Sequence, residues 1–232
     1  AQLASTFVLR IIQCGAFRLK SGAGDFIVHV ARSVAGRYQG GAGQVAGIGS
    51  GLMGSVSGSA VATTVSTGVI TIPMMTRSGF KPRFAAGVEA AASTGGQLMP
   101  PVMGAGAFVM SSYTQIPYLQ IISVSVLPAL LYFLTVAFFV RIEARRLNLV
   151  TGTEAGQPST LEALKSGWHF IIPLAVLIVS LVVGYTPVRS ATFAIFAVIG
   201  VSWFTGSPMN LDKCVDAILD ALRIMVPTAI LL

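Results

Sequence analysis

Long apolar stretches alternate with short basic loops along this chain. A helix needs about 20 apolar residues to cross a hydrocarbon core of about 30 Å. Four stretches have the composition of spanning helices or of parts of them: residues 3–17, 116–140, 168–186 and 191–204. Residues 25–38 instead place apolar side chains at helical spacing among charged ones, which predicts an amphipathic helix at the membrane interface. The pattern predicts an all-α polytopic membrane protein, in which residues 1–232 form a single membrane domain cut from a longer chain.

Residues 43–76 form an uncharged stretch that is too long for a single span. As one straight helix it would reach about 50 Å at about 1.5 Å per residue, well beyond the hydrocarbon core. The Gly/Ser-rich residues 54–59 are the expected break, and the two remaining arms of about 11–16 residues predict a re-entrant helical hairpin. Basic residues flank both ends of the stretch, so the positive-inside rule places both ends on the cytoplasmic face.

A second break is expected within the apolar residues 84–112, which predicts a broken transmembrane helix. The interruption is the segment 93–101, where Pro100 and Pro101 remove backbone donors and restrict the residues before them. Farther along the chain, residues 150–167 are polar and follow a basic cluster. They predict a cytoplasmic connector between two spans.

Composition agrees with a membrane protein and argues against other classes. Hydrophobic residues make up 54% of the chain and charged residues only 10%, against about 25% charged residues in soluble domains. The net charge of +7 does not predict nucleic-acid binding, because the cations lie in short loops and not along one polar face. Cys14 and Cys214 stand alone, and the chain has no nucleophile, phosphate-loop or metal-ligand motif. We therefore expect no enzyme activity, no catalytic residue and no cofactor.

The two helix breaks are the candidate binding site. Backbone that leaves the helix at membrane depth must line a cavity or lie buried in protein, and such breaks bind sodium and anionic substrates in secondary transporters. Serine and threonine hydroxyls add uncharged oxygen ligands, which suit a releasable sodium ion and no other metal. The expected sodium- and substrate-binding residues are Ser55, Ser57, Gly58, Ser59, Ser93, Thr94, Gly95, Gly96, Gln97, Pro100 and Pro101.

Helix packing is the alternative explanation for these glycines and serines. Gly47/Gly51 and Gly54/Gly58 are GxxxG pairs, which let two helices approach closely without any ligand. The pattern alone leaves both interpretations open.

Two charged residues inside apolar stretches need partners. Glu89 lies about two turns into a span, where a carboxylate is a functional candidate by default. The preferred alternative is an ion pair between Glu89 and an arginine near the cytoplasmic interface. Arg10 in the first stretch must face protein, water or the interface, because a mid-membrane arginine costs about 2.5–3.5 kcal/mol.

Two sequence runs resemble a known family. Residues 51–62 read GLMGSVSGSAVA, and residues 86–104 read AGVEAAASTGGQLMPPVMG. The first run resembles the large membrane subunit of tripartite ATP-independent periplasmic (TRAP) transporters. The second resembles the branch in which the small and large permease subunits are fused in one chain, and which works with TAXI-type binding proteins.

This resemblance implies a sodium-coupled importer of carboxylates, such as C4-dicarboxylates or related organic anions. It implies an elevator-type inverted-repeat transporter in a bacterial or archaeal inner membrane, of which the hairpin and the broken helix are one half. The implied partners are a TAXI-type periplasmic binding protein, a small permease subunit and the lipid bilayer, with no nucleic acid. Two other functions remain open: an anion/sodium symporter that needs no binding protein, and a membrane scaffold whose Gly/Ser motifs only pack helices.

Overall fold

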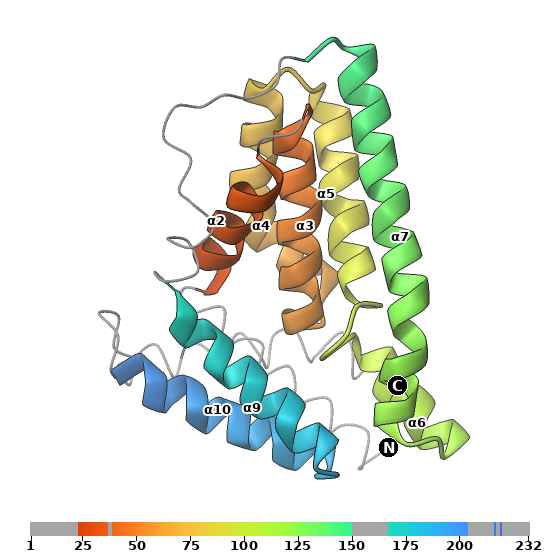
Figure 1. Cartoon of the computed structure of the whole chain (residues 1–232), viewed down its shortest axis with the longest axis vertical. Coiled ribbons are helices and arrows are strands. Elements are labelled where there is room, and N and C mark those ends of the chain that lie inside the picture. Colours follow the sequence, from red (N-terminus) through yellow and green to blue (C-terminus); the bar gives the residue numbers. More distant parts are fainter. Residues whose placement is uncertain (1–22, 37–38, 150–166, 204–215, 217–218, 220–232) are drawn as a thin grey trace.

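The computed structural model of the chain describes residues 23–36, 39–149, 167–203, 216 and 219. Within these residues every regular element is helical, as the apolar patterning predicts. The helices are α2 (Ala23–Ala35), α3 (Gly41–Ser57), α4 (Ala60–Arg77), α5 (Pro82–Gly96), α6 (Ala105–Thr114), α7 (Tyr118–Arg146), the 3-10 turn η1 (Trp168–Phe170), α9 (Ile171–Val182) and α10 (Pro187–Trp203). Figure 1 shows α3, α4, α5 and α7 as an upright bundle, with α2 packed on α3 and with α9 and α10 side by side across its lower end.

Helices α3 and α4 pack against each other and are joined by a turn at Gly58 and Ser59. They have 17 and 18 residues, so the expectation of arms of 11–16 residues is wrong. The helix persists through Gly54 because this residue is a packing site on α5: a Cβ added at Gly96 would lie only 2.6 Å from Gly54 Cα. Tertiary contact therefore overrides the weak helix propensity of the Gly/Ser run.

Helix α5 ends later than the sequence predicted. It runs through Ser93 to Gly96, and the irregular segment covers residues 97–104 before α6 begins. The expected break at residues 93–101 thus starts four residues too early, because the small residues at the end of α5 pack against neighbouring helices. Pro100 and Pro101, joined by a cis peptide, lie within the irregular segment and prevent the helix from continuing.

Helix α7 is the one described helix that is long and apolar enough to cross a membrane. Its 29 residues correspond to about 44 Å at about 1.5 Å per residue. Large apolar side chains on it, among them Leu127, Phe138 and Phe139, are more than half exposed, which marks a surface for contact with lipid or with further protein. The shorter apolar helices α9 and α10 occupy the stretches where spans were expected at residues 168–186 and 191–204.

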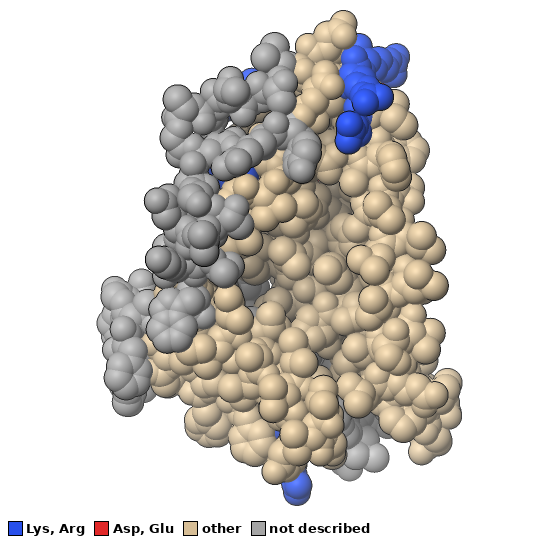
Figure 2. Space-filling model, viewed as in Figure 1, with Lys and Arg blue, Asp and Glu red and all other residues tan. Residues whose placement is uncertain are grey.

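Charge gathers at the ends of the molecule. Figure 2 shows Lys and Arg atoms mainly at the upper end of the visible face and a second group at its lower end, with a broad uncharged surface between them. The last turn of α7 carries Arg145 and Arg146. The stretch 3–17, with Arg10, lies outside the described residues, as does the connector expected at residues 150–167 apart from Gly167.

Two apolar clusters hold the described helices together. One joins α3, α4, α5 and α7 near the start of α3 and the end of α4: Ala46, Met75, Phe80, Ala85, Val88, Val140 and Ala144. The other joins the irregular segment and α6 and α7 to α9 and α10: Val102, Met103, Ala107, Tyr118, Leu177, Leu181, Ala191 and Ala194. The second cluster fixes the irregular segment from below, which positions it against the end of the α3–α4 hairpin.

Candidate functional site

The turn of the α3–α4 hairpin lies against the irregular segment between α5 and α6. The Val102 amide donates to the Ser55 carbonyl at 3.2 Å, and the Gln97 side-chain amide donates to the Gly58 carbonyl at 3.4 Å. We call this contact the tip–break junction, formed by residues 55–59 and 97–104. Two non-helical segments that are far apart in the sequence thus lie in direct contact.

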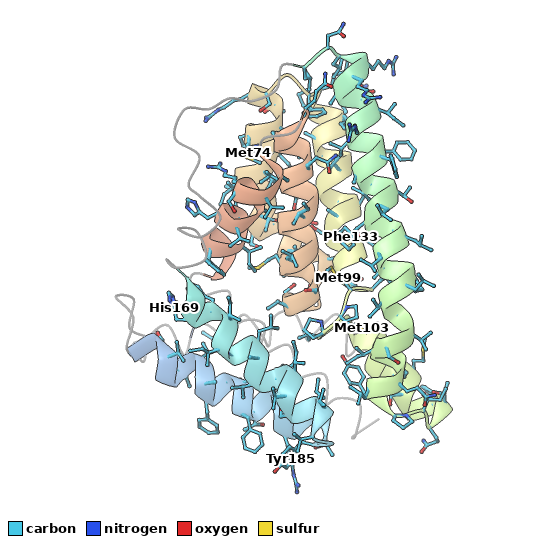
Figure 3. The ribbon with its side chains drawn as sticks, in the orientation of Figure 1. Met74, Met99, Met103, Phe133, His169 and Tyr185 are labelled. Atoms are coloured by element: carbon cyan, nitrogen blue, oxygen red, sulfur yellow. The ribbon has the colours of Figure 1, made fainter. Side chains whose placement is uncertain are left out.

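Glycine is required at the tip of the hairpin. Gly58 has a left-handed φ of 68°, and a Cβ there would lie 2.5 Å from the Met103 carbonyl oxygen. The left-handed conformation and the close approach both exclude ordinary side chains. In Figure 3, Met99 and Met103 mark the irregular segment below the end of α5.

The hydroxyls of the tip are held by bonds within the tip. Ser57 Oγ lies 2.7 Å from Thr63 Oγ1 and accepts the Ser59 amide at 3.3 Å. Ser59 Oγ in turn caps α4 by accepting the Ala62 amide at 3.3 Å. The sequence pattern predicted that Ser57 and Ser59 lie at the tip of the hairpin, and both lie there in the structure.

Four helix ends meet at the tip–break junction. Helix α3 ends at Ser57 and α5 ends at Gly96, while α4 begins at Ala60 and α6 begins after Gly104. Helix C-termini carry a partial negative charge and N-termini a partial positive charge. Several carbonyls at the ends of α3 and α5 already accept one amide hydrogen each, among them Ser55, Gly95 and Gly96, and each keeps a second lone pair. The junction therefore offers groups for a cation and for an anion without any formally charged side chain.

A tyrosine secures the proline part of the break. The Tyr118 hydroxyl donates to the Val102 carbonyl at 2.6 Å and lies 3.3 Å from the Pro101 carbonyl. Pro100 and Pro101 are both half-buried. The irregular backbone is thus held by a side chain from α7 as well as by the tip of the hairpin.

Four residues predicted for the site lie within α5 instead of in unwound backbone: Ser93, Thr94, Gly95 and Gly96. The Thr94 hydroxyl donates to the Ala90 carbonyl of its own helix at 2.8 Å and is exposed. Gly95 is covered by the ring of Tyr132, since a Cβ added there would lie 2.3 Å from it. The structure therefore assigns packing to the glycines, while Ser93 belongs to a separate polar cluster.

That cluster surrounds the carboxylate of Glu89, which is fully buried. Four hydroxyls contact it: Ser50 on α3 at 2.8 and 2.9 Å, Thr67 and Thr71 on α4 at 2.5 Å each, and Ser93 on α5 at 3.2 Å. We call these five residues the hydroxyl cage. It ties the three helices together inside the bundle.

The expected ion pair between Glu89 and an arginine does not form among the described residues. Glu89 faces α3 and α4, and α3 has no ionisable side chain. The only ionisable side chain of helix α4 is Arg77, which is exposed in the last turn. Four hydroxyls contact the carboxylate instead.

Sequence reasoning missed most of the hydroxyl cage. Thr63, Thr67 and Thr71 recur every four residues along α4, which puts them on one face of that helix. All three are buried, and the Thr67 hydroxyl also reaches the Thr63 carbonyl at 2.8 Å. This threonine spacing, read together with a lone carboxylate in the next helix, was the available signal.

The family model of the tripartite ATP-independent periplasmic transporter, DctM component, matches residues 1–232. The chain belongs to the DctM family. It is 27% identical over 213 residues to the C4-dicarboxylate TRAP transporter large permease protein DctM of Pseudomonas aeruginosa, covering 91% of this chain and 49% of that protein. The protein of the same name from Vibrio cholerae is 30% identical over 186 residues, covering 79% of this chain and 40% of the relative.

The match confirms the resemblance of this DctM-family chain to the large permease of TRAP transporters. It also confirms that the chain belongs to a family of transporters and not of enzymes. The chain spans about half the length of the curated relatives it matches. Fusion to a small subunit and pairing with a TAXI-type binding protein stay predictions.

Proposed function

We propose that the full-length protein is a sodium-coupled importer of carboxylates, and that this chain supplies one half of its transport site. The observation that carries the proposal is the tip–break junction, where two interruptions of helix are held together in a chain of the DctM family. Transporters with such broken helices bind ions and substrates at the breaks. C4-dicarboxylates or related organic anions are the proposed substrates, in line with the names of the relatives.

The four helix ends give the junction its two binding preferences. Carbonyls at the ends of α3 and α5, together with the hydroxyls of Ser57 and Ser59, are hard oxygen ligands for sodium. Amides at the starts of α4 and α6 favour the carboxylate of the substrate. Because none of these groups carries a formal charge, the ion is held weakly enough to be released on the other side of the membrane.

We further propose how the chain is oriented in the membrane and which proteins it works with. The α3–α4 hairpin is re-entrant with both ends cytoplasmic, and it moves as part of an elevator-type unit in a multi-pass protein of the bacterial or archaeal inner membrane. A periplasmic binding protein of the TAXI type delivers the substrate, and a small permease subunit is fused to the same chain. The basic ends of α4 and α7 support this orientation through the positive-inside rule.

Uptake by the full-length protein in proteoliposomes tests the proposal. Radiolabelled C4-dicarboxylate, together with the cognate binding protein, should accumulate when a sodium gradient is imposed and not when potassium replaces sodium on both sides. Accumulation without any binding protein would support the alternative of a self-sufficient anion/sodium symporter. Absence of sodium-dependent uptake with every carboxylate and binding protein tried would refute sodium-coupled transport and leave the scaffold alternative.

A further inference from the structure

Exposed cations gather at the end of the bundle that lies opposite the tip–break junction. Helix α4 begins at that junction and ends at Arg77, and the last turns of α7 lie at the same end as the α4–α5 turn (Figure 1). The exposed cations at this end are Arg77, Lys81 and Arg83 around the α4–α5 turn, and Arg141, Arg145 and Arg146 near the end of α7. We call these residues the basic rim.

The two parts of the basic rim are held together by apolar packing. Phe80 in the α4–α5 turn belongs to the same buried cluster as Val140 and Ala144 of α7. A Cβ added at Gly79 would lie 2.7 Å from Leu149 Cδ2, so the turn also packs on the residues that follow α7. Cations from two segments that are far apart in the sequence therefore belong to one surface.

Acidic side chains balance little of this charge in the part of the chain that the structure describes. Glu143 is half-buried and lies 3.7 Å from Arg146. The first turn of α5 carries no acidic residue, and Glu89 is fully buried inside the bundle. The basic rim thus has an excess of positive charge, which an anionic partner would balance.

Exposed apolar side chains adjoin the α7 part of the basic rim. Phe138, Phe139 and Ile142 are all more than half exposed. Ile142 is four residues from Phe138 and four from Arg146, so these three side chains share one face of α7. That face changes from apolar to basic within about two turns of helix.

The partner of this face must be apolar beside Phe138 and Ile142 and anionic beside the arginines. A nucleic acid or an acidic soluble protein would neutralise the cations but would leave the apolar side chains in water. An anionic phospholipid satisfies both parts, because its acyl chains cover apolar side chains and its phosphate lies at the membrane surface. Helix α7 is long and apolar enough to cross a membrane, and Arg145 and Arg146 end it, which places these cations at the level of the headgroups.

We propose that the basic rim is a docking surface for anionic phospholipids. The acyl chains lie along the exposed face of α7, and the headgroups bind the cations of the α4–α5 turn and of the end of α7. Clusters of about four to eight Lys and Arg residues beside a spanning helix attract anionic headgroups in this way. The proposal depends neither on sodium coupling nor on which side of the membrane the basic rim faces.

Competition between two lipids tests the proposal on the full-length protein. Phosphatidylglycerol and phosphatidylcholine with the same acyl chains are mixed with the detergent-solubilised protein, and native mass spectrometry measures the ratio in which the protein retains them. The wild type should prefer phosphatidylglycerol. The preference should fall about fivefold in Arg145→Gln and on the order of thirtyfold in Lys81→Gln/Arg145→Gln, which removes one cation from each part of the basic rim.

The matched control is Arg189→Gln. Arg189 is exposed in the first turn of α10, close in sequence to Tyr185 at the lower end of Figure 3, and its loss should leave the preference unchanged. Arg145→Lys retains the charge and should also retain the preference.

Four results would overturn the proposal. They are equal retention of the two lipids by the wild type, an unchanged preference in Lys81→Gln/Arg145→Gln, and an equal fall in Arg189→Gln, which would mean that net charge alone attracts the lipid. The fourth is displacement of phosphatidylglycerol by millimolar inorganic phosphate, because the basic rim would then be a site for free anions.

Discussion

The close crossing of α3 and α5 makes Gly96→Ala a sharp test of the packing. A Cβ at Gly96 would lie 2.6 Å from Gly54 Cα, 2.9 Å from the Gly54 carbonyl carbon and 3.0 Å from the Gly51 carbonyl oxygen. All three atoms belong to the backbone, so no side chain can turn away. Since carbon atoms rest at about 3.5–4.0 Å, the two helices must separate by about 1 Å.

The cost of Gly96→Ala follows from this displacement. Overpacking of this kind costs about 1–3 kcal/mol, and the better helix propensity of alanine recovers at most about 1 kcal/mol. We expect the thermal unfolding midpoint of the detergent-solubilised full-length protein to fall by several degrees. The separation should also stretch the bonds from Ser50 to Glu89, so the loss extends beyond the crossing itself.

Gly87→Ala is the matched control for this prediction. Gly87 lies on the same helix and is exposed, and a Cβ added there meets nothing within 4 Å. The midpoint of this variant should stay the same or rise, because only helix propensity changes. Equal midpoints for Gly96→Ala and Gly87→Ala would refute the close crossing of α3 and α5.

Three further predictions concern the hydroxyl cage, the break and the topology. Thr71→Val should destabilise the protein by about 1–3 kcal/mol, because it removes one of the two hydroxyls that donate to the buried Glu89 Oε2; Thr94→Val, whose hydroxyl bonds only its own helix, should have little effect in the same unfolding assay. Tyr118→Phe should increase proteolysis in the irregular segment by releasing the carbonyls it binds, whereas Tyr113→Phe at an exposed position should not. Single cysteines at residues 76–82 should react with membrane-impermeant maleimide only from the cytoplasm, and labelling from the periplasm would contradict the re-entrant hairpin.

Much of the helical architecture could be predicted from local patterns. The long apolar run before the Arg145 and Arg146 cluster predicted α7, and the proline pair predicted an interruption after α5. These features depend on hydropathy and on the chemistry of proline, which act within a few residues. The positions where helices end were less accessible, because Gly54 and Gly96 stay helical through contact with each other, and no local pattern encodes that contact.

The candidate site likewise combines residues that local sequence predicts with residues that only tertiary packing places. Ser57, Ser59 and Gln97 lie at the tip–break junction as the two breaks predicted. Thr94 does not, because one residue of helix rotation turns it to the exposed face of α5. The hydroxyl cage could not be predicted without knowing which faces of α3, α4 and α5 pack together. That packing joins segments far apart in the sequence, so no local pattern indicates it.

The most direct test of the sodium site is the sodium concentration that gives half-maximal uptake in Ser57→Ala. The Ser57 hydroxyl lies at the tip, and losing one buried ligand weakens binding by about 1–3 kcal/mol, which is on the order of tenfold or more in affinity. Thr94→Ala removes a hydroxyl that lies away from the junction and serves as the control. We predict that the half-saturating sodium concentration of the full-length protein rises about tenfold in Ser57→Ala and is unchanged in Thr94→Ala. Identical sodium dependence in wild type and Ser57→Ala, with equal amounts of folded protein, would contradict sodium binding at the tip–break junction.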